Sequence, residues 1–127
     1  MADRSFLSWP FFEEHHRRLA AGLESWAADR LAAVDHHDVD ATCRALVRDL
    51  GAAGWLNHTA IDPRDDTAAL DVRTLCLMRE TLARHDGLAD FAFAMQGLGT
   101  GAISLFGSSE QKQTWLAGTR AGKSISA

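Results

Sequence analysis

The 127-residue chain has only two prolines and two cysteines, and it has no excess of basic residues. Two prolines and ten glycines exclude collagen-like and low-complexity chains. The formal net charge is −4, and acidic and basic residues are interspersed, so there is no basic stripe to contact a nucleic-acid backbone. We therefore expect one globular domain with a single core and no nucleic-acid partner.

Signals for export and membrane insertion are missing as well. No apolar run approaches the roughly 20 residues that span a bilayer, and the N-terminus lacks the charged-then-apolar order of a secretion signal. Cys43 and Cys76 lack CxxC spacing and fall inside predicted helices, so we predict two buried free thiols in a reducing compartment. These observations predict a cytoplasmic protein without a membrane partner.

Motifs for nucleophilic catalysis and phosphate binding are also absent. The glycine-rich run 97–101 has neither the GxGxxG spacing nor the preceding strand of a dinucleotide site. Glu13 and His16 have the Glu-x-x-His spacing of di-iron bundles, but that site needs two such motifs and two further carboxylates. We predict no metal centre.

Apolar residues recur at helical spacing in five segments, which predicts an all-α, up-down bundle of about five helices. The first covers 10–34, with Pro10 in its first turn; the second follows an N-cap within 35–38 and ends by Gly51 or Gly54. The others cover about 70–85, 88–106 and 110–120. Ser108 and Gln111 have capping-box spacing before the last one.

The five predicted helices differ in how much of their surface we expect to be buried. Residues 88–106 are apolar on nearly all sides, which predicts a helix buried in the centre. Their three glycines cost roughly 1 kcal/mol each in helix propensity, a cost tolerated where another segment approaches closely or the helix is interrupted. We expect Val72 and Leu75 on the buried stripe of the third helix and Trp115 on the core. The loop 55–69 is long enough to suggest a functional role.

The end of the chain has a different pattern. Gly122 closes the last predicted helix, and the side chains of residues 123–127 alternate as at the start of a strand. A strand needs a partner to pair with. We therefore expect residues 1–122 to form an N-terminal helical domain and residues 123–127 to begin a following β-domain.

Three motifs in the second half resemble the acyl-CoA dehydrogenase family. They are LARHDGLA at 82–89, QGLGTG at 96–101 and FGSSEQKQTWL at 106–116. The most specific is the Gly-Ser-x-Glu-Gln-Lys-Gln-x-Trp-Leu run, which Gly122-Lys123 follows. The resemblance is clear over about 70–127 and weaker over the first two helices, and residues 57–69 depart from the family's Glu-Tyr-Gly-Gly turn.

The resemblance implies the N-terminal domain of an FAD-dependent enzyme that dehydrogenates an acyl-CoA thioester between Cα and Cβ. In this family a β-domain and a second helical domain follow, and FAD binds between them, often across a subunit interface of a dimer or tetramer. A glutamate, in most members within the C-terminal domain, removes the α-proton while a β-hydride passes to the flavin. The base and the flavin site would then lie outside residues 1–127, and the chain alone would be inactive.

The resemblance also nominates substrate-binding residues. A gap-free count back from Gly107 places four residues at positions where the family lines its acyl pocket: Phe91, Ala94, Met95 and Leu98. An apolar slot suits an acyl tail, and the size of its lining residues limits chain length. Asp90 falls at another such position, where a charge is costly unless exposed. One alternative is a stand-alone helical module that binds an apolar ligand or a protein partner without catalysis. Another is an oxidase, or a relative without the catalytic glutamate, on the same scaffold.

Overall fold

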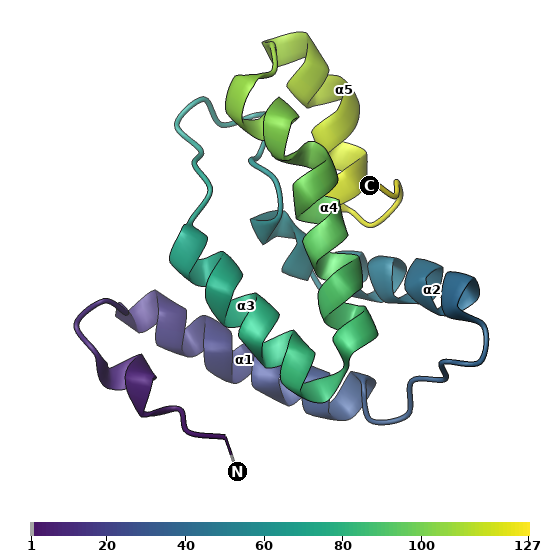
Figure 1. The fold of residues 1–127 in the computed structure, drawn as a ribbon. Helices are drawn as coiled ribbons and strands as arrows, with labels where there is room; N and C mark the ends of the chain where they lie inside the picture. The colour runs from purple at the N-terminus through teal and green to yellow at the C-terminus, as the bar shows by residue number, and fades with distance from the viewer. Residues whose placement is uncertain (1) are drawn as a thin grey trace.

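A computed structural model describes residues 2–127, and within them all regular structure is helical. The α-helices are α1 (Glu14–Arg30), α2 (Val39–Ala52), α3 (Val72–His85), α4 (Gly87–Phe106) and α5 (Ser109–Arg120). Two short 3-10 helices, η1 (Ser5–Ser8) and η2 (Trp55–His58), precede α1 and follow α2 (Figure 1). The predicted all-α class with five helices is confirmed.

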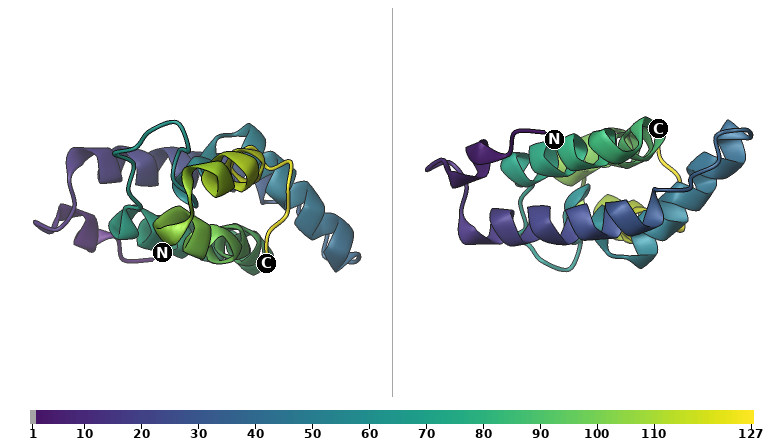
Figure 2. Two further views of the ribbon diagram at one scale, coloured as in Figure 1. Left: turned by 90° about the horizontal axis from the view of Figure 1, so that it is seen from above. Right: turned by 90° about the horizontal axis from the view of Figure 1, so that it is seen from below.

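The helices form two layers (Figure 2). One layer is the hairpin of α3 and α4, which run in opposite directions, and the other contains α1, α2 and α5. Helix α1 packs on α3, whereas α2 and α5 both pack on α4, and η2 fits between α2 and α5. Helix α4 therefore has three helical neighbours and holds the second half of the fold together.

The main core lies between the two layers. Its fully buried side chains come from α1, α2, η2, α3 and α4: Leu23, Ala27, Leu50, Leu56, Met78, Leu82 and Phe93. A smaller cluster of Ala60, Ile61 and Leu116 joins the α2–α3 loop (residues 59–71) to α5. No helix within residues 2–127 combines the length and the apolar character needed to cross a bilayer.

Side-chain caps fix the starts of the helices. Asp38 accepts a hydrogen bond from the Ala41 N–H at 3.0 Å, as predicted for the start of α2. Ser108 and Gln111 form the predicted capping box, with the Ser108 N–H donating to the Gln111 amide oxygen at 2.9 Å. Each cap satisfies a backbone donor that the helix itself leaves unpaired. Local sequence thus determines where these helices begin.

The predicted boundaries of the first helix are wrong at both ends. Helix α1 begins at Glu14, and Pro10 lies in the turn between η1 and α1. The Glu13 N–H donates to Nδ1 of His16 at 3.0 Å, in a capping box that starts the helix. Beyond Arg30, Leu31 and Val34 continue the apolar pattern because they pack on the core from a turn. Packing in a non-helical segment therefore imitated helical periodicity.

Four side chains that were predicted to be buried are not. Both cysteines are free, but Cys43 is half-buried and Cys76 is exposed. Val72 and Trp115 are exposed to 67% and 60%. On α3 the buried face includes Thr74 and Thr81, which an apolar pattern does not count, so the true face is rotated away from Val72.

Residues 123–127 form no strand in the structure, and from Ser124 onward they lie against α4. The side chain of Gln96, which is fully buried, holds them there. Its amide NH₂ donates to the backbone oxygens of Thr119 and Ser124 at 3.3 and 2.9 Å, and its oxygen accepts the Ser126 N–H at 2.8 Å. One buried amide thus satisfies its polar atoms on the last turn of α5 and on the segment that follows it.

Gly99 makes this close approach possible. Helix α4 is continuous through its glycines, and a Cβ at Gly99 would lie 2.6 Å from the Ala127 nitrogen. At Gly101, by contrast, a Cβ would meet no atom within 4 Å. Close approach, one of the two predicted reasons for these glycines, is therefore confirmed at Gly99.

These two glycines give a matched pair of substitutions. We expect Gly101→Ala to raise the free energy of unfolding by about 0.5–1 kcal/mol, because alanine is the better helix former and has free space. Gly99→Ala should give less stabilisation or none, because the Cβ displaces Ser126 and Ala127. Urea unfolding measures the first effect. Faster hydrogen exchange of the Ser126 amide in Gly99→Ala alone measures the second, and equal behaviour of the two variants would contradict the close approach.

A charged cluster ties α1 to α3. Glu24 on α1 accepts hydrogen bonds from the Arg84 guanidinium and pairs with Nε2 of His85 at 2.8 Å, and Arg4 joins it at 3.1 Å. The Arg84 hydrogen bond lowers the pKa of Glu24 from its ordinary 4.5 to about 2, with a further contribution from His85, against the opposing effect of burial. The ionised carboxylate is therefore the form that stabilises the fold.

Because its pKa is lowered, Glu24 stabilises the fold by an amount that depends on pH. Because the folded-state pKa lies below the unfolded one, the stabilisation is complete above pH 4.5 and is lost as the pH falls toward 2. We expect Glu24→Gln to be most destabilising near about pH 6 and nearly neutral near about pH 2. Urea unfolding across this range tests the trend. Asp29→Asn on the exposed side of α1 is the control, and a pH-independent effect of Glu24→Gln would argue against the ion pair.

Candidate functional site on the outer face of α4

Helix α4 has an inner face that is packed and an outer face that is open. Phe93, Gln96 and Thr100 on the inner face are buried. The outer face consists of the apolar residues Phe91, Ala94, Met95, Leu98, Ala102 and Leu105. Leu98 is 74% exposed, and no element within residues 2–127 packs over it. The prediction that this helix is buried on most sides is therefore wrong for its outer face.

The four predicted pocket residues lie together on this outer face. Their spacing of three and four residues places them in one stripe along the helix. Phe91 and Leu98 are exposed, whereas Ala94 and Met95 are half-buried at the edges of the stripe. The structure thus groups these side chains on a surface that the chain leaves uncovered.

A shallow groove runs beside the stripe, between α3 and α4. It has a volume of about 230 Å³, and Ala94 and Leu98 form its α4 wall. Leu75 and Arg79 of α3 form the opposite wall, and Leu70 of the α2–α3 loop contributes from the loop side. Phe91 and Met95 do not line this groove. The lining is mostly apolar, as a hydrocarbon ligand requires.

One ion pair neutralises the charge beside the groove. The Arg79 guanidinium donates two hydrogen bonds to the two oxygens of Asp90, at 2.9 and 2.8 Å. The side chain of Asp90 is only 14% exposed, so its carboxylate needs this partner. Asp90 in turn raises the pKa of Arg79 above its ordinary value. The charge that the sequence placed near the stripe is therefore compensated within the chain.

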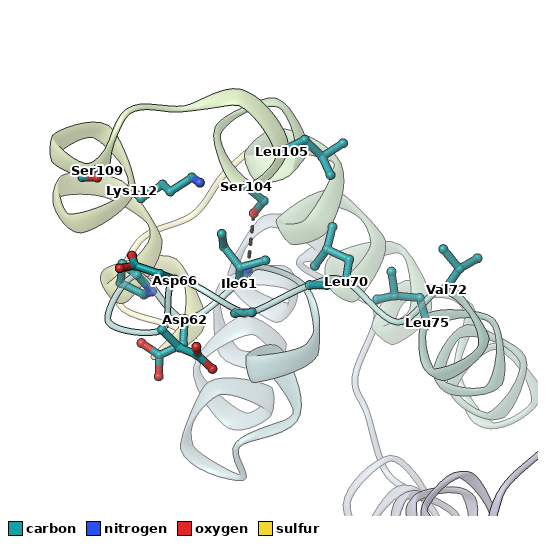
Figure 3. Close-up of a pocket in the computed structure, with 14 residues that line it drawn as sticks. Ile61, Asp62, Asp66, Leu70, Val72, Leu75, Ser104, Leu105, Ser109 and Lys112 are labelled. Atoms are coloured by element: carbon teal, nitrogen blue, oxygen red, sulfur yellow. Dashed lines mark hydrogen bonds between the residues drawn. The ribbon is translucent and has the colours of Figure 1, made fainter.

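A second hollow continues from the groove toward α5 (Figure 3). It has a volume of about 490 Å³ and shares Leu70 and Leu75 with the groove. The Ile61 N–H donates to Oγ of Ser104 at 3.4 Å. This hydrogen bond joins the α2–α3 loop to α4 within the lining of the hollow. Asp66 of the loop and Lys112 of α5 lie at its rim. The long loop therefore forms one side of both hollows.

Sequence reasoning did not find the wall opposite α4. Leu75 was expected only as a core residue, but it is half-buried and lines both hollows. Leu70 and Arg79 gave no motif to recognise. The one available signal was the length of the loop 55–69, and Leu70 lies just after that range.

The Glu13–His16 pair has a structural role at the start of α1. Ligand atoms of Glu13, His15 and His16 lie within 4.8 Å of one another. Nδ1 of His16 accepts the Glu13 N–H, so Nε2 carries the ring proton and donates to Asp71 at 2.8 Å. Both ring nitrogens of the buried His16 are thus engaged: Nδ1 caps the start of α1, and Nε2 joins α1 to the start of α3.

A comparison with known families matches most of the chain. The model of the family described as "Acyl-CoA dehydrogenase, N-terminal domain" matches residues 13–123, a range that includes all five α-helices and the outer face of α4. No match to the chain was found among curated proteins.

The open apolar stripe should make the chain associate with itself. We expect concentration-dependent oligomers and binding of a hydrophobic dye, because contiguous exposed apolar surface favours association. Leu98→Lys should reduce both, because a charge in the centre of the stripe opposes its burial. Sedimentation velocity and dye fluorescence measure the effects.

Val39→Lys is the matched control, because Val39 is exposed on α2, outside the stripe. It should leave association unchanged. A wild-type chain that stays monomeric and binds no dye, or an equal effect of both lysines, would contradict this role of the outer face.

Proposed function

This chain belongs to the acyl-CoA dehydrogenase N-terminal domain family, and on that premise we propose that it is the N-terminal helical domain of an FAD-dependent acyl-CoA dehydrogenase. In this proposal residues 1–122 form the domain and residues 123–127 lead into a β-domain. The outer face of α4 contributes one wall of the acyl pocket through Phe91, Ala94, Met95 and Leu98. The observation that most supports this proposal is the uncovered apolar stripe beside the groove.

The dimensions of the groove support a shared pocket. Its volume of about 230 Å³ is smaller than the roughly 300–1,000 Å³ of typical small-molecule sites. A hydrocarbon tail on this surface would keep one side in water, which forfeits much of the free energy of burial. A second wall from another domain would enclose the tail and exclude water. The α3–α4 surface therefore fits one half of a pocket.

FAD does not fit the groove between α3 and α4. The apolar groove is too small to enclose a three-ring isoalloxazine together with a diphosphate, and the cation that lines it, Arg79, is bound to Asp90. We propose that residues outside this chain hold FAD, which supplies hydride acceptance when bound, and also provide the catalytic base. The chain alone would then be inactive and would act in the enzyme by shaping the acyl pocket.

The side chains of the stripe would set the shape of the slot. Phe91 and Met95 are large and would narrow it, whereas Ala94 leaves space between α3 and α4. The Arg79–Asp90 pair presents no net charge to the tail. Substrate selection would thus depend on the volume of a few apolar side chains.

The proposal is tested by enlarging Ala94 in the full-length gene product. We expect the enzyme to purify with flavin and to oxidise acyl-CoA thioesters. Ala94→Leu should lower kcat/KM for long-chain relative to short-chain substrates by about tenfold or more, since one misplaced methylene already costs roughly that factor. Steady-state kinetics across acyl chain lengths measures this ratio.

Ala83→Leu on the exposed surface of α3 is the control and should leave the ratio unchanged. If Ala94→Leu left the long-chain to short-chain ratio of kcat/KM unchanged, the proposal that α4 lines the acyl pocket would be wrong. A full-length product without flavin or thioester oxidation, whose helical domain still binds fatty acids, would support the alternative of a non-catalytic binding module.

A further inference from the structure

Most cations of this acidic protein are paired with carboxylates, and most of the unpaired ones lie in one place. Nine of the 13 lysine and arginine side chains lie within 4.0 Å of a carboxylate oxygen, and all nine are arginines. Within residues 2–127, the four without such a partner are Arg44, Arg48, Lys112 and Lys123. Three of these four line a single hollow.

This basic hollow lies where the end of α5 meets α2. It has a volume of about 340 Å³ and is lined by Arg44, Arg48, Ala121, Gly122, Lys123 and Ile125. Arg44 and Arg48 are one helical turn apart and exposed, so their guanidinium groups extend from the same side of α2. Lys123 comes from a segment far away in the sequence and lines the same hollow.

The backbone is built to bring Lys123 to this position. Gly122 has φ +69°, in the left-handed region that favours glycine, and it is buried against α2. A Cβ at Gly122 would lie 2.5 Å from the Val47 oxygen, and one at Gly51 would lie 2.5 Å from the Ala121 oxygen. Two glycines in contact therefore allow the turn after α5 to lie directly on α2, beside the arginine pair.

The neighbouring carboxylates do not neutralise the three cations. Asp49, on the same helix, is engaged with Arg30 at 3.4 Å. Asp40 lies one turn before Arg44, yet it makes no ion pair within residues 2–127. Two like charges one turn apart destabilise a helix, and a bound anion would relieve this repulsion.

We propose that the basic hollow binds the phosphate group of a phosphomonoester or diphosphate. Three cations in so small a volume call for an anion with two or three charges concentrated on one group, and phosphates provide this whereas a single carboxylate does not. The planar guanidinium groups of Arg44 and Arg48 donate paired hydrogen bonds to phosphate oxygens, and Lys123 adds a third charge. Ile125 at the rim would contact the organic part of the ester. The site does not depend on the proposed acyl pocket.

The test is a calorimetric titration of the protein with inorganic pyrophosphate at low ionic strength. We expect saturable binding with one site per chain that weakens as salt is added. Arg44→Gln and Arg48→Gln should each weaken binding by about tenfold or more, the loss expected for one charge-assisted hydrogen bond. Lys112→Gln removes the fourth unpaired cation, which lies outside the hollow, and should change the affinity by on the order of twofold or less.

Two further arms identify the source of the phosphate. Co-sedimentation with vesicles that contain phosphatidic acid, lost in Arg44→Gln, would assign a lipid headgroup; pyrophosphate binding without co-sedimentation would assign a soluble compound. Either outcome supports the site. Absence of saturable binding, an equal loss in Lys112→Gln, or tighter binding of a tri-glutamate peptide than of pyrophosphate would overturn the proposal. Unchanged circular dichroism of each variant shows that the fold is intact.

Discussion

Helix α4 has apolar side chains on two faces, but partners within the chain for only one of them. Its inner face contacts α2, α3 and α5, and Phe93 closes the core between the two layers. These three helices are placed by this contact, so the inner face cannot rotate toward solvent without opening the core. The outer stripe around Leu98 is therefore held at the surface by the packing of the opposite side. The exposed stripe is a direct consequence of how the core is filled.

The buried amide of Gln96 adds direction to this packing. Apolar contacts would tolerate small shifts between α4 and the end of α5, whereas an amide without water must find donors and acceptors at fixed positions. Gln96 finds them on Thr119, Ser124 and Ser126, and Gly99 leaves the space for it. The same turn after α5 carries Lys123 to α2. One polar side chain thus positions both the exit of the chain and a wall of the basic hollow.

Local signals made most of the helices predictable, because caps such as Asp38 and Ser108 act on the nearest backbone donors. The start of α1 was missed because Pro10 suits a turn as well as a first helical turn. The buried faces of the helices were harder to predict, since burial depends on neighbours distant in the sequence. Trp115, for example, is exposed although its helix is amphipathic. For the site, spacing was enough to place the stripe on one face of α4. The loop side of the groove, at Leu70, depends on the path of the loop, which no periodicity encodes.

The two surfaces to which we assign functions are exceptions to rules that the rest of the molecule follows. Large apolar residues mostly pack on the core and arginines mostly pair with carboxylates, so isolated deviations would mean little. In two places, however, several deviations lie side by side. Phe91 and Leu98 lie in one stripe, and Arg44, Arg48 and Lys123 lie in one hollow. Each cluster is held in place by buried contacts on its other side, the stripe by Phe93 and the hollow by glycine-mediated packing. Rigid placement of unsatisfied groups is what binding to another molecule requires, because the cost of ordering them is already met by folding.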